Sequence, residues 1–377
     1  MLFRSCGDPA TASTNPENDS EHPMKLPIDR APKNICILRL SALGDVTHTV
    51  PVVRAILKQW PDVHLTWIIG STEYKLLGAL PGVEFIVFDK RGGRNAIRRL
   101  RKSLSGRSFD ILLHMQVALR ANLLSRLIRS PIRLGWDRAR SRDGHHWFTN
   151  HAIPIRERQH QVDAFLEFAW ALGIPEHAPD WSLPVHAEHD EWAAAQLPGT
   201  QPTLMISPCS SHPDRNWRPE RYAQIGDHAV SSMNMRVALI GGPSALEQEV
   251  GQQIESLMSL PPVNLIGKDT LPQTMALLKR ADVLIAPDSG PVHIASALGT
   301  PVIGLYAATW SRRSGPWNSL ELCVDRFPEA ARKFRGAAPE DLRWGTRIET
   351  SGVMDLVEAK DVIDQLEIWA DPLTPKS

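Results

Sequence analysis

The sequence predicts an α/β protein made of two successive halves, in each of which buried strands alternate with helices. Three observations support this class. The chain has 377 residues, more than a single core usually organises. Its apolar runs are short and mostly unbroken, as in parallel strands that are covered on both faces. Most of these runs are followed by a turn and then by a helical pattern, as in a doubly wound fold.

Each half is expected to be a Rossmann-like domain. In the first half, strands are expected at residues 34–40, 63–69, 83–88 and 109–115, and a helix runs from residue 43 to about 60. In the second half, strands are expected at residues 203–207, 235–240, 263–266, 283–286 and 302–306. Open parallel sheets bind ligands outside the carboxyl ends of their strands, so the cleft between the two domains is the expected binding site.

The domain boundaries follow from composition. Residues 175–202 carry five prolines, which mark the interdomain connection. The predicted domains are therefore residues 33–185 and 200–350. Residues 1–32 are rich in Pro, Ser, Thr, Asn and acids without periodicity, so a disordered leader is expected, within which Met24 is an alternative translation start. A helix at 353–369 is expected to pack back on the first domain.

One strand-to-helix turn has the composition of an anion site. The apolar run 283–286 is followed by Asp288, Ser289 and Gly290, which supply helix-capping chemistry, and Pro291 suits the first position of a helix. The free N–H groups at such a helix start favour phosphate, and a glycine lets a ligand approach the backbone closely. An ordinary capped turn without a ligand is the alternative interpretation of this segment taken alone.

Composition excludes several other classes. The 42 basic side chains balance the 42 acidic ones, so the overall charge does not indicate a nucleic-acid partner. The four cysteines are far apart and form no Cys-x-x-Cys pair, which indicates neither a disulfide scaffold nor a zinc site and favours a cytoplasmic protein. No apolar run approaches the length of a membrane span, so we expect at most peripheral association with a membrane.

Missing motifs narrow the ligand further. The sequence contains no Gly-x-Gly pair and no Gly-x-x-x-x-Gly-Lys, which argues against nicotinamide and P-loop chemistry. It also contains no Asp-x-Asp, the metal clamp of many sugar-nucleotide enzymes. A site without metal and without a further cofactor is therefore expected.

Several motifs together resemble the ADP-heptose:lipopolysaccharide heptosyltransferases, glycosyltransferase family 9. The resemblance spans roughly residues 34–320. It rests on LRLSALGDVTHTVP at 38–51, RNW at 215–217 with ERY at 220–222, GGP at 241–243, and LIGK at 265–268 through DSGPVH at 288–293. It implies two Rossmann-like domains in the GT-B arrangement and an inverting transfer of heptose from ADP-heptose to a lipopolysaccharide inner-core acceptor.

The resemblance and the chemistry of the residues together assign roles. Transfer from a nucleotide diphosphate sugar needs a base for the acceptor hydroxyl and a group that stabilises the departing diphosphate. Asp45 is the predicted base, with a helix-capping carboxylate as its alternative role. Arg215 is the predicted phosphate clamp, although the family frequently has Lys there, and a solvated loop arginine is the alternative. The other predicted donor-binding residues are Asp288, Ser289, Gly290, Pro291, His293, Glu247, Thr309, Gly241, Gly242 and Lys268.

Within this donor set, some positions have structural alternatives. Asp288 is expected to contact sugar hydroxyls or to order the loop, because a bare carboxylate would repel a diphosphate. Glu247 is assigned to the nucleotide ribose or to a solvated helix face, and His293 to a phosphate or to a structural role. Where relatives often show Gly-Pro-Thr-Asp-Pro, residues 307–311 read AATWS, so Trp310 is expected to reshape the wall nearest the donor sugar.

The acceptor is expected on the first domain, which carries a run of basic residues at 90–107 and further arginines at 120–142. This local excess suits an anionic glycolipid at the inner-membrane surface, where each basic side chain contributes about 1 kcal/mol; a solvated helix face is the alternative. The predicted acceptor-binding residues are Gly44, Thr47, His48, Arg94, Arg98 and Arg120. Two other functions stay open, namely transfer from a different nucleotide sugar to a surface glycan, and a catalytically silent protein that binds a nucleotide sugar.

Overall fold

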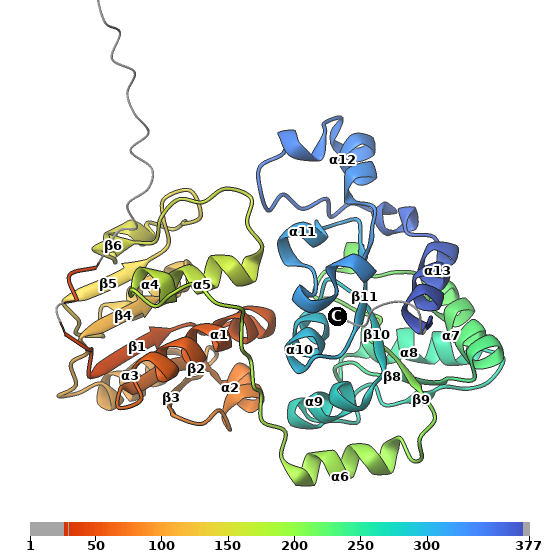
Figure 1. The fold of residues 1–377 in the computed structure, drawn as a ribbon, viewed down its shortest axis with the longest axis horizontal. Helices are drawn as coiled ribbons and strands as arrows, with labels where there is room; N and C mark the ends of the chain where they lie inside the picture. The colour runs from red at the N-terminus through yellow and green to blue at the C-terminus, as the bar shows by residue number, and fades with distance from the viewer. Residues whose placement is uncertain (1–25, 29, 372–377) are drawn as a thin grey trace, which may run out of the picture.

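The computed structural model describes residues 26–28 and 30–371, and within them two parallel sheets of six strands each (Figure 1). The first sheet has the strand order β3-β2-β1-β4-β5-β6. Its strands are β1 (Asn34–Leu38), β2 (His64–Gly70), β3 (Val83–Phe88), β4 (Ile111–His114), β5 (Ile132–Gly135) and β6 (His151–Ala152). Its helices are α1 (Leu43–Gln59), α2 (Ser71–Leu77), α3 (Gly93–Ser103), α4 (Leu119–Ser125), η1 (His145–Trp147) and α5 (Gln161–Ala171).

The second sheet repeats this topology, with the order β9-β8-β7-β10-β11-β12. Its strands are β7 (Thr203–Ile206), β8 (Arg236–Leu239), β9 (Val263–Asn264), β10 (Val283–Pro287), β11 (Val302–Tyr306) and β12 (Val324–Asp325). Its helices are η2 (Pro213–Arg215), α7 (Pro219–Met233), α8 (Ala245–Leu257), α9 (Leu271–Arg280), α10 (Gly290–Leu298), α11 (Ser311–Ser314), η3 (Trp317–Leu322), α12 (Phe327–Arg335), η4 (Pro339–Asp341), η5 (Val353–Leu356) and α13 (Ala359–Ala370). The predicted α/β class with two Rossmann-like domains is confirmed.

The strand order determines where a ligand can bind. In each sheet the order reverses at the first strand, so the switch points lie between β1 and β4 and between β7 and β10. Crevices form there because the connections on either side leave in opposite directions. The two turns that the sequence singles out, after β1 and after β10, are therefore both at switch points.

Helices cover both faces of the first sheet. Along β1, Ile35 and Ile37 belong to the core under α1 and α5, whereas Cys36 and Leu38 belong to the core under α3 and α4. This alternation is the period of two of a strand, and it explains why a strand buried on both faces is apolar throughout.

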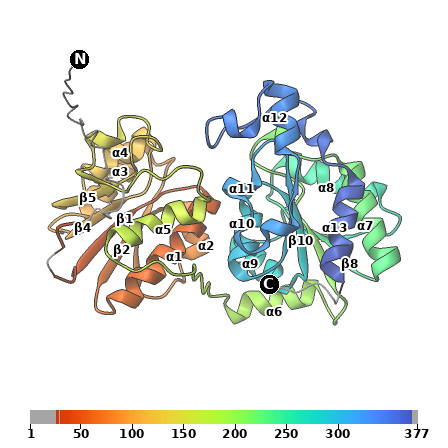
Figure 2. The same ribbon diagram turned by 45° about the horizontal axis from the view of Figure 1, so that its top comes forward.

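The two halves are joined by apolar packing as well as by the chain. The core on the α1 side of the first sheet continues into α9 and α10 of the second half, and α1 contacts α10 while α6 (Ala187–Gln196) contacts α9. Figure 2 shows α1, α2 and α5 on the side of the first half that faces α9 and α10. An ion pair between Asp190 and Arg280 adds a polar contact at this junction.

The connection between the halves is anchored on α1. Pro51 lies inside this helix and has no backbone N–H, which leaves the carbonyl of Thr47 without its usual helical partner. The indole Nε1 of Trp181 donates to that carbonyl at 3.1 Å, and Arg54 donates to the carbonyls of Trp181 and Ser182. A buried tryptophan thus attaches the proline-rich segment to the helix that carries Asp45.

Two expectations about the chain ends need correction. The predicted leader extends to residue 32, but Leu26 is buried in the first core and Ile28 packs against it, because both are apolar side chains within reach of that core; residues 1–25 lie outside the described residues. The terminal helix α13 packs on α7, β11 and β12 of the second half, not on the first domain. Val362 and Leu366 on α13 are fully buried in the second core.

Candidate functional site

The turn after β1 holds a carboxylate and an arginine in contact. Asp45 lies in the first turn of α1, where its carboxylate accepts from the backbone N–H of Ala42 at 3.1 Å and pairs with the guanidinium of Arg39. Arg39 is buried, donates to the carbonyl of Met115 at 2.5 Å and lies over the ring of Phe165. The Asp45 side chain keeps 33% of its surface exposed, so it caps the helix and remains accessible to a ligand.

The turn after β10 begins a helix with free amides. Ser289 is the N-cap of α10, and the helix starts at Gly290. Pro291 therefore occupies the second position of the helix, whereas the sequence predicts the first. The Ser289 hydroxyl has no hydrogen-bond partner within the described residues. The start of α10, with its N–H groups and the positive end of the helix dipole, is therefore the place in this half whose chemistry suits an anion.

Arg215 lies beside this turn and is held by two carboxylates. It ends the short helix η2 after β7, is buried, and donates from Nε and Nη2 to Oε1 of Glu349 at 2.9 and 2.5 Å. Its Nη1 lies 3.7 Å from Oδ2 of Asp288. Burial tends to raise the pKa of Asp288, but His293, Arg215 and Thr309 together hold that pKa below its ordinary value. Asp288 is therefore an ionised group that orders the loop through Arg215 and His293.

The two turns meet directly. Nε2 of His48 on α1 lies 3.2 Å from Nδ1 of His293 on α10, and the rings are edge to face with centroids 4.6 Å apart. A Cβ added at Gly44 would lie 2.4 Å from Cδ2 of His293, and one added at Gly290 would lie 3.5 Å from Cβ of Leu43. Gly44 thus permits the close approach of His293 across the interface.

A third histidine completes this contact. His160 caps α5 by accepting from the N–H of Val162, and its Nε2 lies 3.0 Å from the carbonyl oxygen of Gly315 in the second half. Burial holds the pKa of His160 at about 4, and burial, His293 and His160 hold that of His48 well below its ordinary value. Both histidines are consequently neutral at neutral pH.

The GGP segment forms a self-contained turn. Glu247 in the first turn of α8 accepts from the backbone N–H of Gly242, and a Cβ at Gly241 or Gly242 would lie 2.9 or 3.0 Å from its carboxylate. Lys268 is exposed and donates to the carbonyl of Asn264 at 2.7 Å. The Glu247 carboxylate therefore already orders its own loop, and in the predicted role it would also bind the nucleotide ribose.

The segment 307–311 differs from its predicted role. Thr309 is buried beside Asp288, on whose pKa it acts through a hydrogen bond. Trp310 is buried and stacks on Phe327 with ring centroids 5.3 Å apart, and Trp344 packs beside it. Trp310 is therefore part of the second core and does not form a wall next to a sugar, because its aromatic surface is covered by other rings.

The predicted acceptor residues separate into two groups. Thr47 is fully buried and its hydroxyl donates to the carbonyl of Leu43, so it offers no group to an acceptor; Gly44 and His48 belong to the interface just described. Arg94 and Arg98 are exposed on α3, and the exposed Arg120 on α4 donates to the carbonyl of Lys90. These arginines form an outer surface of the first half.

Three charged residues near the site were not assigned by sequence reasoning. Arg39 lies within the 38–51 motif, but nothing in the sequence indicates that it pairs with Asp45. Glu349 lies on a segment that also touches the first half, because Trp344 donates to the carbonyl of Gln159 at 3.0 Å and Arg158 donates to that of Leu342. Arg313 is the second residue after the 307–311 segment, and its position two residues before Gly315-Pro316 is the signal that could have identified it.

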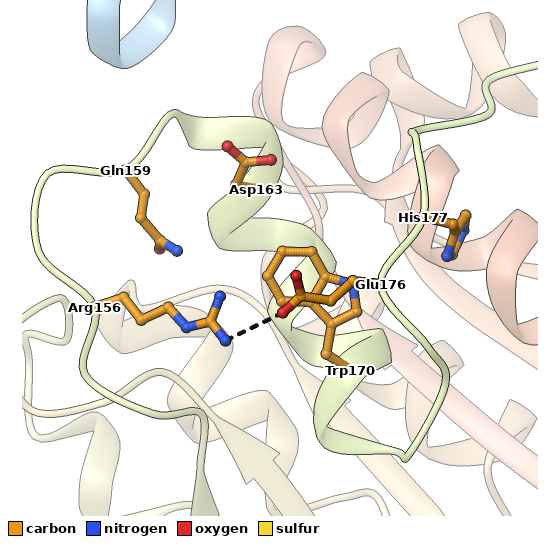
Figure 3. Close-up of a pocket in the computed structure, with 6 residues that line it drawn as sticks. All are labelled: Arg156, Gln159, Asp163, Trp170, Glu176 and His177. Atoms are coloured by element: carbon orange, nitrogen blue, oxygen red, sulfur yellow. Dashed lines mark hydrogen bonds and ion pairs between the residues drawn. The ribbon is translucent and has the colours of Figure 1, made fainter. Parts of the chain in front are cut away.

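A cavity of about 510 Å³ lies elsewhere, on α5 and the start of the interdomain connection (Figure 3). Arg156 there pairs with Glu176 and lies over the ring of Trp170. Burial, Glu167 and Glu176 raise the pKa of Asp163 to about 6. This cavity does not suit a diphosphate, because its arginine is already paired with Glu176 and two of its lining residues are carboxylates. Its lining residues are Arg156, Gln159, Asp163, Trp170, Glu176 and His177.

Two Rossmann-like domains whose switch-point turns meet at His48 and His293, with Asp45 on the first turn and Asp288 beside Arg215 on the second, form the GT-B architecture of glycosyltransferases. The chain belongs to glycosyltransferase family 9, the heptosyltransferases. Residues 97–341 match the model of glycosyltransferase family 9 (heptosyltransferase). The chain is 37% identical over 337 residues to the lipopolysaccharide core heptosyltransferase OpsX of Haemophilus influenzae, which covers 89% of this chain and 97% of the relative.

Solved structures agree on the fold. A family 9 glycosyltransferase from Veillonella parvula superposes with a TM-score of 0.73 at 22% identity, over 89% of this chain and 97% of that one. The Escherichia coli heptosyltransferase WaaC with ADP superposes with a TM-score of 0.67 at 19% identity, over 89% of this chain and all (100%) of that one.

Proposed function

We propose that this protein transfers heptose from ADP-heptose to a lipopolysaccharide core acceptor, with inversion at the anomeric carbon and without a metal ion. The observation that carries the proposal is the meeting of the two switch-point turns at His48 and His293, with Asp45 on one side and Arg215, Asp288 and the start of α10 on the other. The name of the Haemophilus influenzae relative supports the acceptor class. The structure of Escherichia coli WaaC with ADP supports an adenine nucleotide as the donor.

The proposed reaction is a single displacement. Asp45 takes the proton of the acceptor hydroxyl, the hydroxyl oxygen bonds to the anomeric carbon, and the bond from that carbon to the diphosphate oxygen breaks. The electron pair leaves with ADP, whose developing charge faces Arg215 and the amides of α10. One base and one displacement imply inversion, because the hydroxyl attacks opposite the leaving group.

A transfer assay tests this function. The purified protein is given a heptose-free core acceptor and, in parallel, ADP-heptose or other nucleotide sugars, with a chelator present. Transfer from ADP-heptose with inverted product configuration, read by NMR, is the expected result. Preference for another nucleotide sugar would replace the donor, loss of transfer in chelator would contradict metal independence, and binding without transfer would favour the silent alternative.

We further propose that the first half contacts the cytoplasmic surface of the inner membrane. Around α4, Leu119, Leu123 and Trp147 expose 54%, 58% and 73% of their surface. The region is continuous, because Asp143 accepts from the N–H of Leu119 and Trp147 covers the neighbouring Gly144. Exposed apolar groups of this size, beside exposed arginines, are typical of an interfacial surface.

The arginines of this surface are exposed; they are Arg94, Arg98, Arg120, Arg126 and Arg142. None of the helices in the described ranges has the length and apolarity of a membrane span.

Vesicle sedimentation tests the membrane contact. Replacing Leu119 and Leu123 by Glu should reduce binding to vesicles that contain anionic lipid, because it removes apolar area and adds negative charge. The matched control replaces Leu246 and Leu257 on α8, which are similarly exposed at 51% and 48% on the second half. Equal binding of both variants and the wild type would contradict this surface.

A further inference from the structure

Arg313 brings a cation from the second half to the interface between the halves. It lies on the short helix α11 (Ser311–Ser314), which begins at the last residue of the 307–311 segment. On one side its guanidinium touches Gly345: a Cβ added there would lie 3.0 Å from the Arg313 Nε. Two residues later, the carbonyl of Gly315 contacts His160 of the first half at 3.0 Å. The segment 313–315 therefore lies between the 339–349 segment and the first domain.

The other two arginines of the site are already paired. Arg39 contacts Asp45, and Arg215 is bonded to Glu349 and lies beside Asp288, so two carboxylates face the single charge of Arg215. The guanidinium of Arg313 forms neither an ion pair nor a hydrogen bond within residues 26–28 and 30–371. It is thus the uncommitted cation among these three.

The carboxylates of both halves act on this guanidinium. Burial lowers the pKa of Arg313, while Asp45 from the first half and Asp288 from the second act to raise it. Arg313 in turn helps to lower the pKa values of His48 and His160 at the interface. The chain geometry agrees with this, because Arg313 lies four residues after Thr309, which bonds to Asp288, and two residues before Gly315, whose carbonyl contacts His160.

We propose that Arg313 is a second catalytic cation, which contacts the diphosphate of the donor and stabilises the charge that develops on it as the sugar leaves. This role rests on the proposed function. The leaving diphosphate needs positive charge in addition to Arg215, since the pair of carboxylates around Arg215 already offsets its single charge. An unpaired, partly buried guanidinium supplies that charge and can bind two phosphate oxygens at once.

The test compares Arg313→Gln with the wild type, and uses Arg312→Gln as the matched control. Arg312 is the adjacent residue of the same helix, is exposed, and lies over the ring of Trp310. Titration with ADP and with adenosine separates the phosphates from the nucleoside. We expect Arg313→Gln to bind ADP at least about tenfold more weakly with adenosine unaffected, and kcat/KM to fall about 100-fold. Arg313→Lys should recover part of the ADP affinity.

The outcomes distinguish this role from the proposed function. If the wild type transfers no heptose from ADP-heptose, the proposed function fails. If the wild type is active and Arg313→Gln binds ADP normally, the role of Arg313 fails, whether or not the KM for the acceptor changes. Equal losses in Arg312→Gln and Arg313→Gln would also overturn it, because they would indicate disruption of α11 and not loss of a phosphate contact.

Discussion

His48 and His293 connect the two halves at the point where chemistry is proposed, with Nε2 of one lying 3.2 Å from Nδ1 of the other. His293 also lies 3.7 Å from Asp288, and Asp288 lies beside Arg215. A continuous polar chain therefore runs from helix α1, which carries Asp45, to the proposed phosphate clamp. The relative position of the two halves and the state of the donor side are thus physically linked.

Replacing Asp45 should abolish turnover while donor binding persists. In Asp45→Asn the amide oxygen can still accept from the N–H of Ala42, so the helix cap is retained, but the side chain no longer takes a proton. We expect kcat to fall by about 100-fold or more and the affinity for ADP to change little. Calorimetric titration with ADP beside a transfer assay measures both. Full activity of this variant would end the assignment of the base.

Replacing Arg215 should weaken the transition state. Arg215→Ala removes the proposed clamp and leaves Glu349 and Asp288 without their shared cation, so we expect a loss of about 3 kcal/mol in kcat/KM. Arg215→Lys should lose less, because the charge is kept. Arg218→Ala is the control, since Arg218 is exposed three residues further on and, among the residues that the structure describes, forms its ion pair with Asp355. Similar kinetics for the two alanine variants would refute the clamp.

Local signals in the sequence predict the strands and turns of the site better than the ion pairs between its side chains. The sequence predicts a strand at residues 283–286, where β10 lies (Val283–Pro287), and the turn at Asp288, because an unbroken apolar run that stops at capping residues has few other solutions. Glu349 could not be found this way, because it is 134 residues from Arg215 and only the tertiary fold brings them together. The two-residue strands β6 and β12 were missed for the same reason, since their neighbours in the sheet define them.

Adding a methyl group at Gly44 should separate the halves. The new Cβ would lie 2.4 Å from the His293 ring, closer than atoms can approach, so the interface must shift. Because a misplacement of about 1 Å can cost about 100-fold in rate, we expect a loss of that order, together with a larger radius of gyration in solution scattering. Gly290→Ala is the control for shape, since its Cβ would make an ordinary contact with Leu43 at 3.5 Å. An unchanged radius in Gly44→Ala would contradict the closed contact.

Lowering the pH should destabilise the fold through His160. Its pKa is about 4 in the folded protein, against 6.5 for the unperturbed group, chiefly because it is buried and also because of His293 and Arg313. Between these two pKa values the unfolded chain binds more protons than the folded one. The contribution of neutral His160 to the free energy of unfolding is therefore complete above pH 6.5 and is lost, by up to about 3 kcal/mol, as the pH falls towards 4. His48 adds to this loss. Urea unfolding from pH 7.5 to 5 measures it, and His160→Asn, which can still cap α5, should show a shallower decline. An equally steep decline in that variant would assign the effect to other groups.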